Sequence, residues 1–364
     1  MPSTSSDSTA VRILIIGPMP PPYTGTTTLL EYLVDLLKVK EDVTIHVLNT
    51  LGVRGRGIAG VLNFGRLVWR ACTQARKHDI VTLHASTSGL HVIAPVAYIA
   101  ARLAGKPLLI RKFAGDDYQT TLGPIGRRID VFVLRRAELY MAESKHLVQS
   151  AKDDGVPRVE WYPNSRPVPE KAPDASTKPD TCLRYVYVGR VVEGKGMRAM
   201  AEASKKLPET ISIDVYGPWG DDLEETLFED CPRIQYHGPL KPEAIIPTME
   251  QYDASLLPTH YRGEGYPGAI LESYLAGLPV IVTRWRALPE IVDESVGIFV
   301  EPRDAEGLAA AMIRLSEDPA LFQSMRSNTR TKAEFFSSVR WAEHFLDRCR
   351  DLIDPDKTKN DSAS

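Results

Sequence analysis

Residues 254–283, ASLLPTHYRGEGYPGAILESYLAGLPVIVT, contain the pattern that decides the fold of this chain. The apolar runs 254–257 and 280–283 have the length and composition of buried strands, and residues 269–276 between them are predicted to form a helix. Two buried strands that flank a helix form a βαβ unit, in which the strands run parallel. This stretch therefore predicts a parallel sheet covered by helices.

The same alternation extends in both directions. In the N-terminal part, strands are predicted at 11–16, 43–48, 79–83, 107–110 and 139–142, and helices at 27–38, 58–77, 90–104, 126–136 and 145–154. In the C-terminal part, further strands are predicted at 184–188, 211–216, 234–237 and 297–300, and further helices at 197–207, 223–229 and 242–250 and from about 300 to 353. The whole chain is therefore predicted to be an α/β protein.

A proline-rich segment interrupts this alternation. PNSRPVPEKAPDASTKP, residues 163–179, has five prolines and many polar residues, which is typical of a linker between domains. We therefore predict a disordered tail at 1–10, a Rossmann-like domain at 11–165, a linker at 166–180, a second Rossmann-like domain at 181–340 and a disordered tail at 354–364. Ligands of such sheets bind beyond the carboxyl ends of the strands, so the natural site is a cleft between the two domains.

Composition excludes several classes of protein. The net charge of −3 and the mean hydropathy of −0.19 argue against a nucleic-acid binder and an integral membrane protein. The four cysteines are far apart, with no CxxC pair, so we expect neither a zinc site nor a disulfide framework, and a cytoplasmic location. Residues 1–165 carry a charge of +6 and the rest −9, which indicates different partners for the two halves.

Two loops of the C-terminal half have the chemistry of a phosphate and sugar site. In GRVVEGKG, residues 189–196, Arg190 and Lys195 flank a glycine-bearing turn between a strand and a helix, where an anion is favoured. The second loop opens the helix 269–276 and brings Glu264 eight residues before Glu272, and such carboxylates accept hydrogen bonds from vicinal hydroxyls. Each signal alone also fits an ordinary turn with solvated charges.

Together these motifs resemble the retaining glycosyltransferases of family four, the glycosyl transferases group 1. Residues 264–283 resemble the glutamate–seven–glutamate signature, residues 189–196 the phosphate-binding GR…KG segment, and residues 289–292 the usual PEIV. The resemblance implies a GT-B fold, with two Rossmann-like domains that face a cleft. It also implies that the last helix, about 341–353, returns to the N-terminal domain.

The resemblance also implies roles for individual residues. The catalytic residues would be Arg190 and Lys195, which neutralise the departing diphosphate, and Glu264, near the donor sugar. Glu272 would hold the ribose hydroxyls. The rest of the donor pocket would consist of Gly25, Gly189, Gly217, Gly265, Tyr266, Pro267 and Gly268. The leaving phosphate would take the proton of the acceptor on the same face, with retention. We expect no metal and no cofactor, because cations are present and no DxD motif occurs within either predicted domain.

The N-terminal domain departs from the family pattern. The histidine expected after the fourth strand is absent from RKFAGDD, residues 111–117, and Asp116 is a candidate replacement as a hydroxyl acceptor. The usual double glycine of the first loop is reduced to Gly25. His84 ends the third predicted strand and resembles a common family histidine that contacts the acceptor or donor sugar, although a hydrogen-bonded histidine at a strand end is an equal alternative.

The expected function is transfer of a hexose from a nucleotide-diphosphate sugar, with UDP favoured, to a saccharide or lipid-linked saccharide in polysaccharide or glycolipid assembly. Residues 54–77 combine six basic side chains with apolar ones, so this segment either contacts the anionic inner face of a membrane peripherally or is an ordinary helix with one buried face. Two other functions stay open: a nucleotide-sugar epimerase on the same scaffold, and an inert sugar-nucleotide binder.

Overall fold

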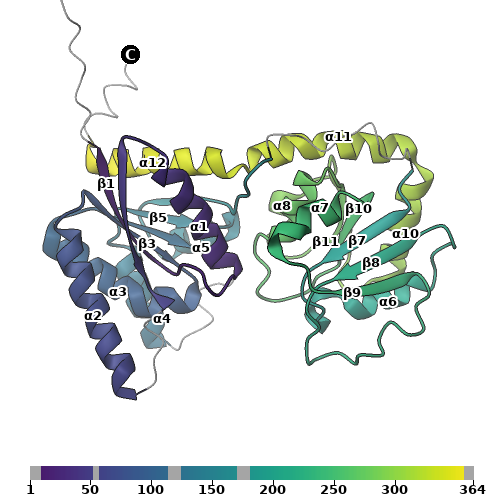
Figure 1. Cartoon of the computed structure of the whole chain (residues 1–364), viewed down its shortest axis with the longest axis horizontal. Helices are drawn as coiled ribbons and strands as arrows, with labels where there is room; N and C mark the ends of the chain where they lie inside the picture. The colour runs from purple at the N-terminus through teal and green to yellow at the C-terminus, as the bar shows by residue number, and fades with distance from the viewer. Residues whose placement is uncertain (1–9, 52–56, 114–123, 170–180, 356–364) are drawn as a thin grey trace, which may run out of the picture. The chain divides into compact units, whose positions relative to one another are not determined.

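The computed structural model describes residues 10–51, 57–113, 124–169 and 181–355. It divides into two compact units, 1–165 with 338–364, and 166–337 (Figure 1). The predicted tails at 1–10 and 354–364 lie almost entirely outside the described residues, and so does most of the predicted linker. Each unit is described by itself below.

The N-terminal unit is built on a parallel sheet of six strands in the order β2-β1-β3-β4-β5-β6. The strands are β1 (Val11–Gly17), β2 (Val43–Asn49), β3 (Ile80–Ala85), β4 (Leu108–Lys112), β5 (Leu139–Ala142) and β6 (Val159–Trp161). Every side chain of β3, β4 and β5 is buried, as expected for central strands that are covered on both faces. The last strand, β6, has no apolar run and was not predicted.

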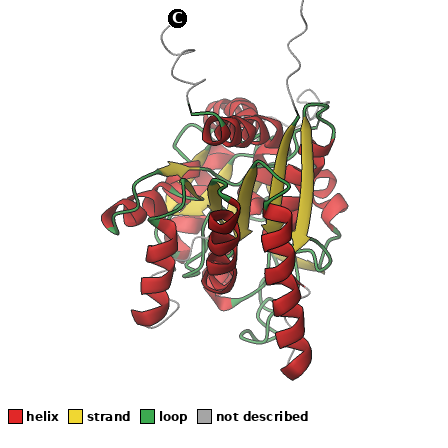
Figure 2. Cartoon of the chain, turned by 90° about the vertical axis from the view of Figure 1, so that its left-hand side faces the viewer, coloured by secondary structure: helices red, strands yellow, loops and turns green. Residues whose placement is uncertain are grey.

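Helices cover both faces of this sheet (Figure 2). They are α1 (Gly25–Lys38), α2 (Gly57–Ala75), α3 (Thr87–Ala104), α4 (Pro124–Leu134), α5 (Lys145–Asp153) and the C-terminal α12 (Ser338–Ile353). Helices α2 and α3 pack against each other, as do α3 and α4, whereas α12 packs on α1 and on β3. Trp341 of α12 anchors this return, because its carbonyl accepts a hydrogen bond of 2.6 Å from the buried Tyr162 hydroxyl.

The C-terminal unit repeats the architecture with the order β12-β11-β10-β7-β8-β9. Its strands are β7 (Arg184–Val188), β8 (Ser212–Tyr216), β9 (Ile234–Gly238), β10 (Ala254–Leu257), β11 (Val280–Thr283) and β12 (Gly297–Val300). Its helices are α6 (Met197–Ser204), α7 (Ile245–Met249), α8 (Gly268–Leu275), α9 (Leu288–Ile291), α10 (Ala305–Glu317) and α11 (Pro319–Phe335), with the short 3₁₀ turns η3 (Glu193–Lys195) and η4 (Pro242–Ala244).

The βαβ unit predicted from residues 254–283 is present, with β10 and β11 parallel and in register. One predicted helix is wrong: residues 223–229 form a series of turns. Leu223 is buried there but Leu227 is only half-buried, so the segment lacks the continuous apolar face that stabilises a helix. In this sheet β10 is paired with β7, so the loops that follow these two strands leave the same edge side by side.

Candidate functional site

The two loops singled out in the sequence meet at the carboxyl ends of β7 and β10. The backbone N–H of His260 donates to the Gly194 carbonyl at 2.8 Å, and the Thr259 hydroxyl lies 3.3 Å from the same carbonyl. Gly196 has a φ of 81°, and a Cβ there would lie 2.0 Å from the Pro258 carbonyl oxygen. Only glycine allows this approach, so the sequence GKG fixes how closely the two loops pack.

Lys195 and Glu264 form an ion pair at the centre of this contact. Lys195 Nζ lies 2.6 Å from Glu264 Oε2, and the Thr259 hydroxyl donates to the same oxygen at 2.6 Å. The Lys195 and Glu264 side chains are only 16% and 6% exposed. The pair is therefore held in a partly water-excluded position, where electrostatic interactions are stronger than at the surface.

Arg190 lies at the start of the same loop and differs from Lys195 in its surroundings. Its side chain is exposed and forms no ion pair with any acidic residue in the described part of the chain. Its carbonyl accepts a hydrogen bond of 2.7 Å from the Tyr187 hydroxyl. Burial, and then the Glu264 carboxylate, raise the pKa of Tyr187 well above its usual range, so Tyr187 stays a neutral donor that fixes the loop. Arg190 thus presents an exposed guanidinium without an acidic partner among the described residues, in the same loop as Lys195.

Glu272 lies on α8, the helix that follows the second loop. Its Oε1 accepts a hydrogen bond of 3.0 Å from Arg166 Nε, and both side chains are mostly buried. A Cβ on Gly268 would lie 1.9 Å from Arg166 Nη2, so a glycine at the first residue of α8 makes room for this guanidinium. Arg166 is therefore a site residue that sequence reasoning missed, because its proline-rich surroundings indicated a linker.

Thr259 was also missed, since a threonine after a strand carries no distinctive signal. Two further glycines of the predicted donor pocket, Gly189 and Gly217, lie at the carboxyl ends of β7 and β8. Gly189 N–H donates to the Tyr216 carbonyl at 2.9 Å, and Gly217 has a φ of 147° with its Cβ position 1.7 Å from the Gly189 carbonyl oxygen. These two glycines therefore allow the loops after β7 and β8 to touch.

The turn 265–267 leads into α8, with Pro267 at the N-cap position. Gly265 is buried, and the Tyr266 side chain is 3% exposed with its hydroxyl 2.6 Å from Glu290 Oε2. The side chain of Tyr266 is thus committed to the interior of the unit. Only its backbone is placed to meet a ligand.

The N-terminal candidates lie in the other unit, apart from Asp116, which lies outside the described residues. Gly25 is exposed and is the first residue of α1, whose N-cap Thr24 accepts from the Thr27 N–H. His84 is completely buried, with its ring 5.4 Å from that of Phe345. Burial, and then the charge of Arg111, hold the pKa of His84 well below 6.5, so the imidazole is neutral.

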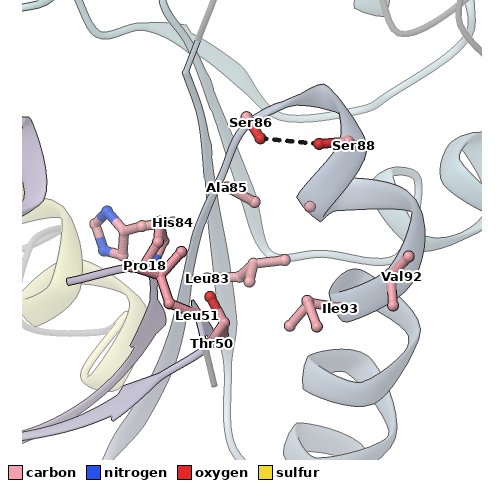
Figure 3. A pocket seen from close by; sticks show the side chains of 11 residues that line it. Pro18, Thr50, Leu51, Leu83, His84, Ala85, Ser86, Ser88, Val92 and Ile93 are labelled. Atoms are coloured by element: carbon pink, nitrogen blue, oxygen red, sulfur yellow. Dashed lines mark hydrogen bonds between the residues drawn. The ribbon is translucent and has the colours of Figure 1, made fainter. Parts of the chain in front are cut away.

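A pocket of about 300 Å³ lies beside His84, at the carboxyl ends of β1 to β3 and the start of α3 (Figure 3). Its lining is mostly apolar, with Leu51, Leu83, Val92 and Ile93, and it includes the hydroxyl-bearing Thr50, Ser86 and Ser88. Figure 3 shows the imidazole of His84 on the opposite side of β3 from the Leu83 and Ala85 side chains, so its ring does not enter this pocket.

No group of three or more His, Cys, Asp and Glu side chains is arranged to hold a metal ion in the ranges that the structure describes. Across the same ranges, every helix is too short or too polar to cross a bilayer.

Comparisons with known proteins show similarity to glycosyltransferases in the part of the chain that contains this candidate site. Residues 183–318 match the family model of the glycosyl transferases group 1. The amylovoran biosynthesis glycosyltransferase AmsK of Erwinia amylovora is 32% identical over 152 residues, 38% of this chain and 37% of the relative. The UDP-Gal:alpha-D-GlcNAc-diphosphoundecaprenol alpha-1,3-galactosyltransferase of Escherichia coli is 26% identical over 308 residues, 76% of each chain. The matches to the first curated relatives span about two fifths of the length of those proteins.

Solved structures show the same fold over nearly the whole chain. The crystal structure of Anabaena Alr3699/HepE in complex with UDP superposes with a TM-score of 0.76 and 17% identity, covering 94% of this chain and 100% of that one. At this identity the likeness shows the fold alone. Residues 183–318 are therefore similar to the glycosyl transferases group 1, and the chain has the GT-B fold.

Proposed function

We propose that this protein is a retaining, metal-independent glycosyltransferase that transfers a hexose from a UDP-sugar to a saccharide or lipid-linked saccharide. The observation that carries the proposal is the Lys195–Glu264 ion pair, 2.6 Å long, in the same loop as Arg190, which has no acidic partner among the described residues. Both loops lie in the region that matches the glycosyl transferases group 1. The names of the relatives support a role in polysaccharide or glycolipid assembly. One is named for amylovoran biosynthesis, and another for UDP-Gal and a diphosphoundecaprenol acceptor.

The arrangement of cations accounts for the leaving group. As the bond between the anomeric carbon and the β-phosphate oxygen breaks, negative charge accumulates on the diphosphate. Arg190 has no acidic partner among the described residues, so its guanidinium is available to bind phosphate oxygens in a bidentate manner. Lys195 is already oriented by Glu264, so little reorganisation is needed when charge develops.

Glu264 and Glu272 would have different roles in donor binding. Glu272 uses Oε1 to accept from Arg166, and we assign Oε2 to the ribose hydroxyls of the nucleotide. Arg166 is then a positioning residue, because it fixes the rotamer of Glu272 without touching the donor. Glu264 uses Oε2 for Lys195 and Thr259, and we assign Oε1 to a hydroxyl of the donor sugar.

The transfer step needs no separate base in this proposal. The acceptor oxygen forms a bond to the anomeric carbon on the face from which the phosphate leaves, and its proton passes to a phosphate oxygen. Configuration at the anomeric carbon is therefore retained. We place the acceptor on the N-terminal unit, at the pocket formed by the carboxyl ends of its strands, whose apolar lining suits a lipid-linked saccharide.

The same charge argument supports metal independence, since the side chains of Arg190 and Lys195 supply the positive charge that a metal ion would otherwise supply. We assign the protein to the cytoplasm, in peripheral contact with an anionic membrane. A contact between His84 and the acceptor stays a prediction. The His84 side chain is completely buried in the described structure.

The proposal is tested first by nucleotide binding. UDP is expected to raise the melting temperature more than GDP or ADP, and excess EDTA is expected to leave the shift unchanged. Transfer is then followed by NMR with UDP-hexoses and saccharide acceptors, where retention appears as product with the anomeric configuration of the donor. Epimer formed from the donor alone would establish the epimerase instead, and binding without turnover would establish the inert binder.

A further inference from the structure

The outer surface of three neighbouring helices in the N-terminal unit exposes an unusual number of large apolar side chains. Of the thirteen such side chains among the described residues, eight lie on α2, α3 and α4. Because α2 packs on α3 and α3 on α4, these three helices form one layer of the unit (Figure 1). We call this set the apolar belt; it consists of Val61, Leu62, Trp69, Val92, Ile99, Leu103, Ile129 and Phe132.

The spacing of the belt shows that these side chains form stripes and are not scattered. On α3, Val92, Ile99 and Leu103 follow one another at seven and four residues, which places them on one face of the helix, and they are 52%, 49% and 63% exposed. Clustered exposure of this kind marks a surface that contacts a partner or a membrane.

The charges on the same three helices are one-sided. Helices α2 and α3 contain no acidic residue, and the single acid of α4, Asp130, is buried beside His91. The exposed charged residues of the three helices are all arginines, at 66, 70, 102, 127 and 128. Arg102 pairs with Glu138 and Arg127 with Asp154, so Arg66, Arg70 and Arg128 are the ones without an acidic partner among the described residues. A surface that only needs to be soluble usually interleaves both signs, so this face is suited to an anionic partner.

A basic groove lies at the edge of this face, between α2 and the edge strand β2. It has a volume of about 720 Å³, and its lining includes Arg66, Arg70 and His46 but no acidic residue. Arg66 and Arg70 are one helical turn apart, an arrangement in which like charges repel, and neither pairs with an acid in the described ranges. The pKa of His46 is lowered by burial and then by the cationic surroundings of His78, Arg70 and Lys77. An anionic group in the groove would relieve this repulsion.

We propose that the α2–α3–α4 face docks on an anionic lipid bilayer, with the apolar belt in the interfacial region and lipid phosphates in the Arg66–Arg70 groove. A bilayer fits both features at once, since interfacial helices combine exposed apolar and aromatic side chains with arginines. The inference rests on the proposed function in one respect: docking would bring the acceptor pocket, whose lining includes the belt residue Val92, to the membrane that holds a lipid-linked acceptor.

Flotation of the full-length chain with lipid vesicles tests this surface. The protein is expected to float with vesicles of phosphatidylcholine and phosphatidylglycerol, to stay in solution with phosphatidylcholine alone, and to release as salt is raised. Val61→Asp is expected to lower the vesicle affinity at least about tenfold. Val39→Asp is the matched control, because Val39 and Val61 are similarly exposed, at 78% and 73%. Val39 lies at the end of α1, outside the apolar belt, so Val39→Asp is expected to float like the parent.

The groove is tested by charge. The double variant Arg66→Gln with Arg70→Gln is expected to weaken binding by roughly fivefold for each arginine. Arg314→Gln with Arg330→Gln removes the same charge from exposed positions on α10 and α11 and is expected to float like the parent. Equal loss in both double variants would overturn the groove assignment, leaving only a net-charge effect.

Three results would overturn the docking proposal. The first is equal flotation with neutral and anionic vesicles, and the second is no flotation with either. The third is a stable dimer, seen by sedimentation, that Val61→Asp dissociates; this result would assign the apolar belt to a second copy of the chain. The UDP-induced melting shift is measured on the same samples. A protein that binds UDP but not vesicles fails this inference and the proposed membrane contact, but leaves the proposed transfer reaction standing. A protein that binds vesicles but no nucleotide fails the transfer reaction alone.

Discussion

The pair of Lys195 and Glu264 supports an experiment that separates folding from catalysis. Lys195→Met removes the cation but leaves a carboxylate that is 6% exposed, with the Thr259 hydroxyl at 2.6 Å as its remaining partner. Breaking a buried pair on one side typically costs about 3–5 kcal/mol. Because the Lys195 side chain is still 16% exposed, we expect the lower end of that range, about 3 kcal/mol.

The reciprocal change and the double variant complete a thermodynamic cycle. Glu264→Gln retains an oxygen that accepts from Thr259, so its expected cost is about 2 kcal/mol. The double variant Lys195→Met with Glu264→Gln holds no unpaired charge and is expected to be about as stable as either single variant, a coupling of about 2–3 kcal/mol. Scanning calorimetry is the suitable measurement, because it separates the transitions of the two units.

Turnover then distinguishes the roles of the pair. If Lys195 stabilises charge on the leaving phosphate, transfer from the UDP-sugar falls roughly 10²–10³-fold in Lys195→Met. Transfer stays low in the double variant, although that variant loses no more stability than the single variants. A change in unfolding free energy below about 0.5 kcal/mol for Lys195→Met would refute the ion pair. A double variant with turnover within about tenfold of the parent would refute the catalytic role of Lys195.

Three further predictions concern other parts of the molecule. Gly196→Ala is expected to destabilise the C-terminal unit by at least about 2 kcal/mol, because φ at Gly196 is 81° and the new Cβ would lie 2.0 Å from a carbonyl oxygen. Gly25→Ala is the control, because a Cβ at Gly25 would have nothing within 4 Å. Similar melting temperatures for the two variants would contradict this prediction. Arg166→Met is expected to raise KM for the UDP-sugar about tenfold with little change in kcat, since only the positioning of Glu272 is lost; an equal fall in kcat would give Arg166 a different role. The N-terminal unit is expected to lose stability as the pH falls below 6.5, because the folded-state pKa of His84 is well below that value and the unfolded chain takes up the proton first. The expected slope of the unfolding free energy against pH is at most about 1.4 kcal/mol per pH unit. Unfolding measured at several pH values should show that His84→Leu flattens this slope and that His146→Leu does not.

Much of the fold was predictable because both sheets are parallel and covered on both faces. Their central strands must then be continuous apolar runs, and such runs at 11–16, 254–257 and 280–283 are visible in the sequence. The edge strand β6 was missed for the opposite reason, since its three residues are all half-buried and carry no apolar run. The false helix at 223–229 shows that a few apolar residues do not suffice where tertiary packing gives them no common face.

The residues of the candidate site also form two groups, those that the sequence predicted and those that it did not. Arg190, Lys195, Glu264 and Glu272 were identified from residue type and spacing within two loops, and β-strand pairing then brings those loops together. The partners of these residues were not predictable. Thr259 is an ordinary residue whose importance comes from its 2.6 Å contact with Glu264, and Arg166 reaches Glu272 from 106 positions away in the chain.

The sequence by itself determined the α/β class, the two-unit organisation and the residue types of the two candidate loops, because apolar periodicity and glycine, arginine and lysine spacing are local properties of the chain. Only the tertiary structure decided which charges are compensated. It pairs Lys195 with Glu264 and Arg166 with Glu272, leaves Arg190 without an acidic partner among the described residues, and withdraws His84 from solvent. The physical reason is that a charge is neutralised, or left available for a ligand, by neighbours that only folding brings within a few ångströms.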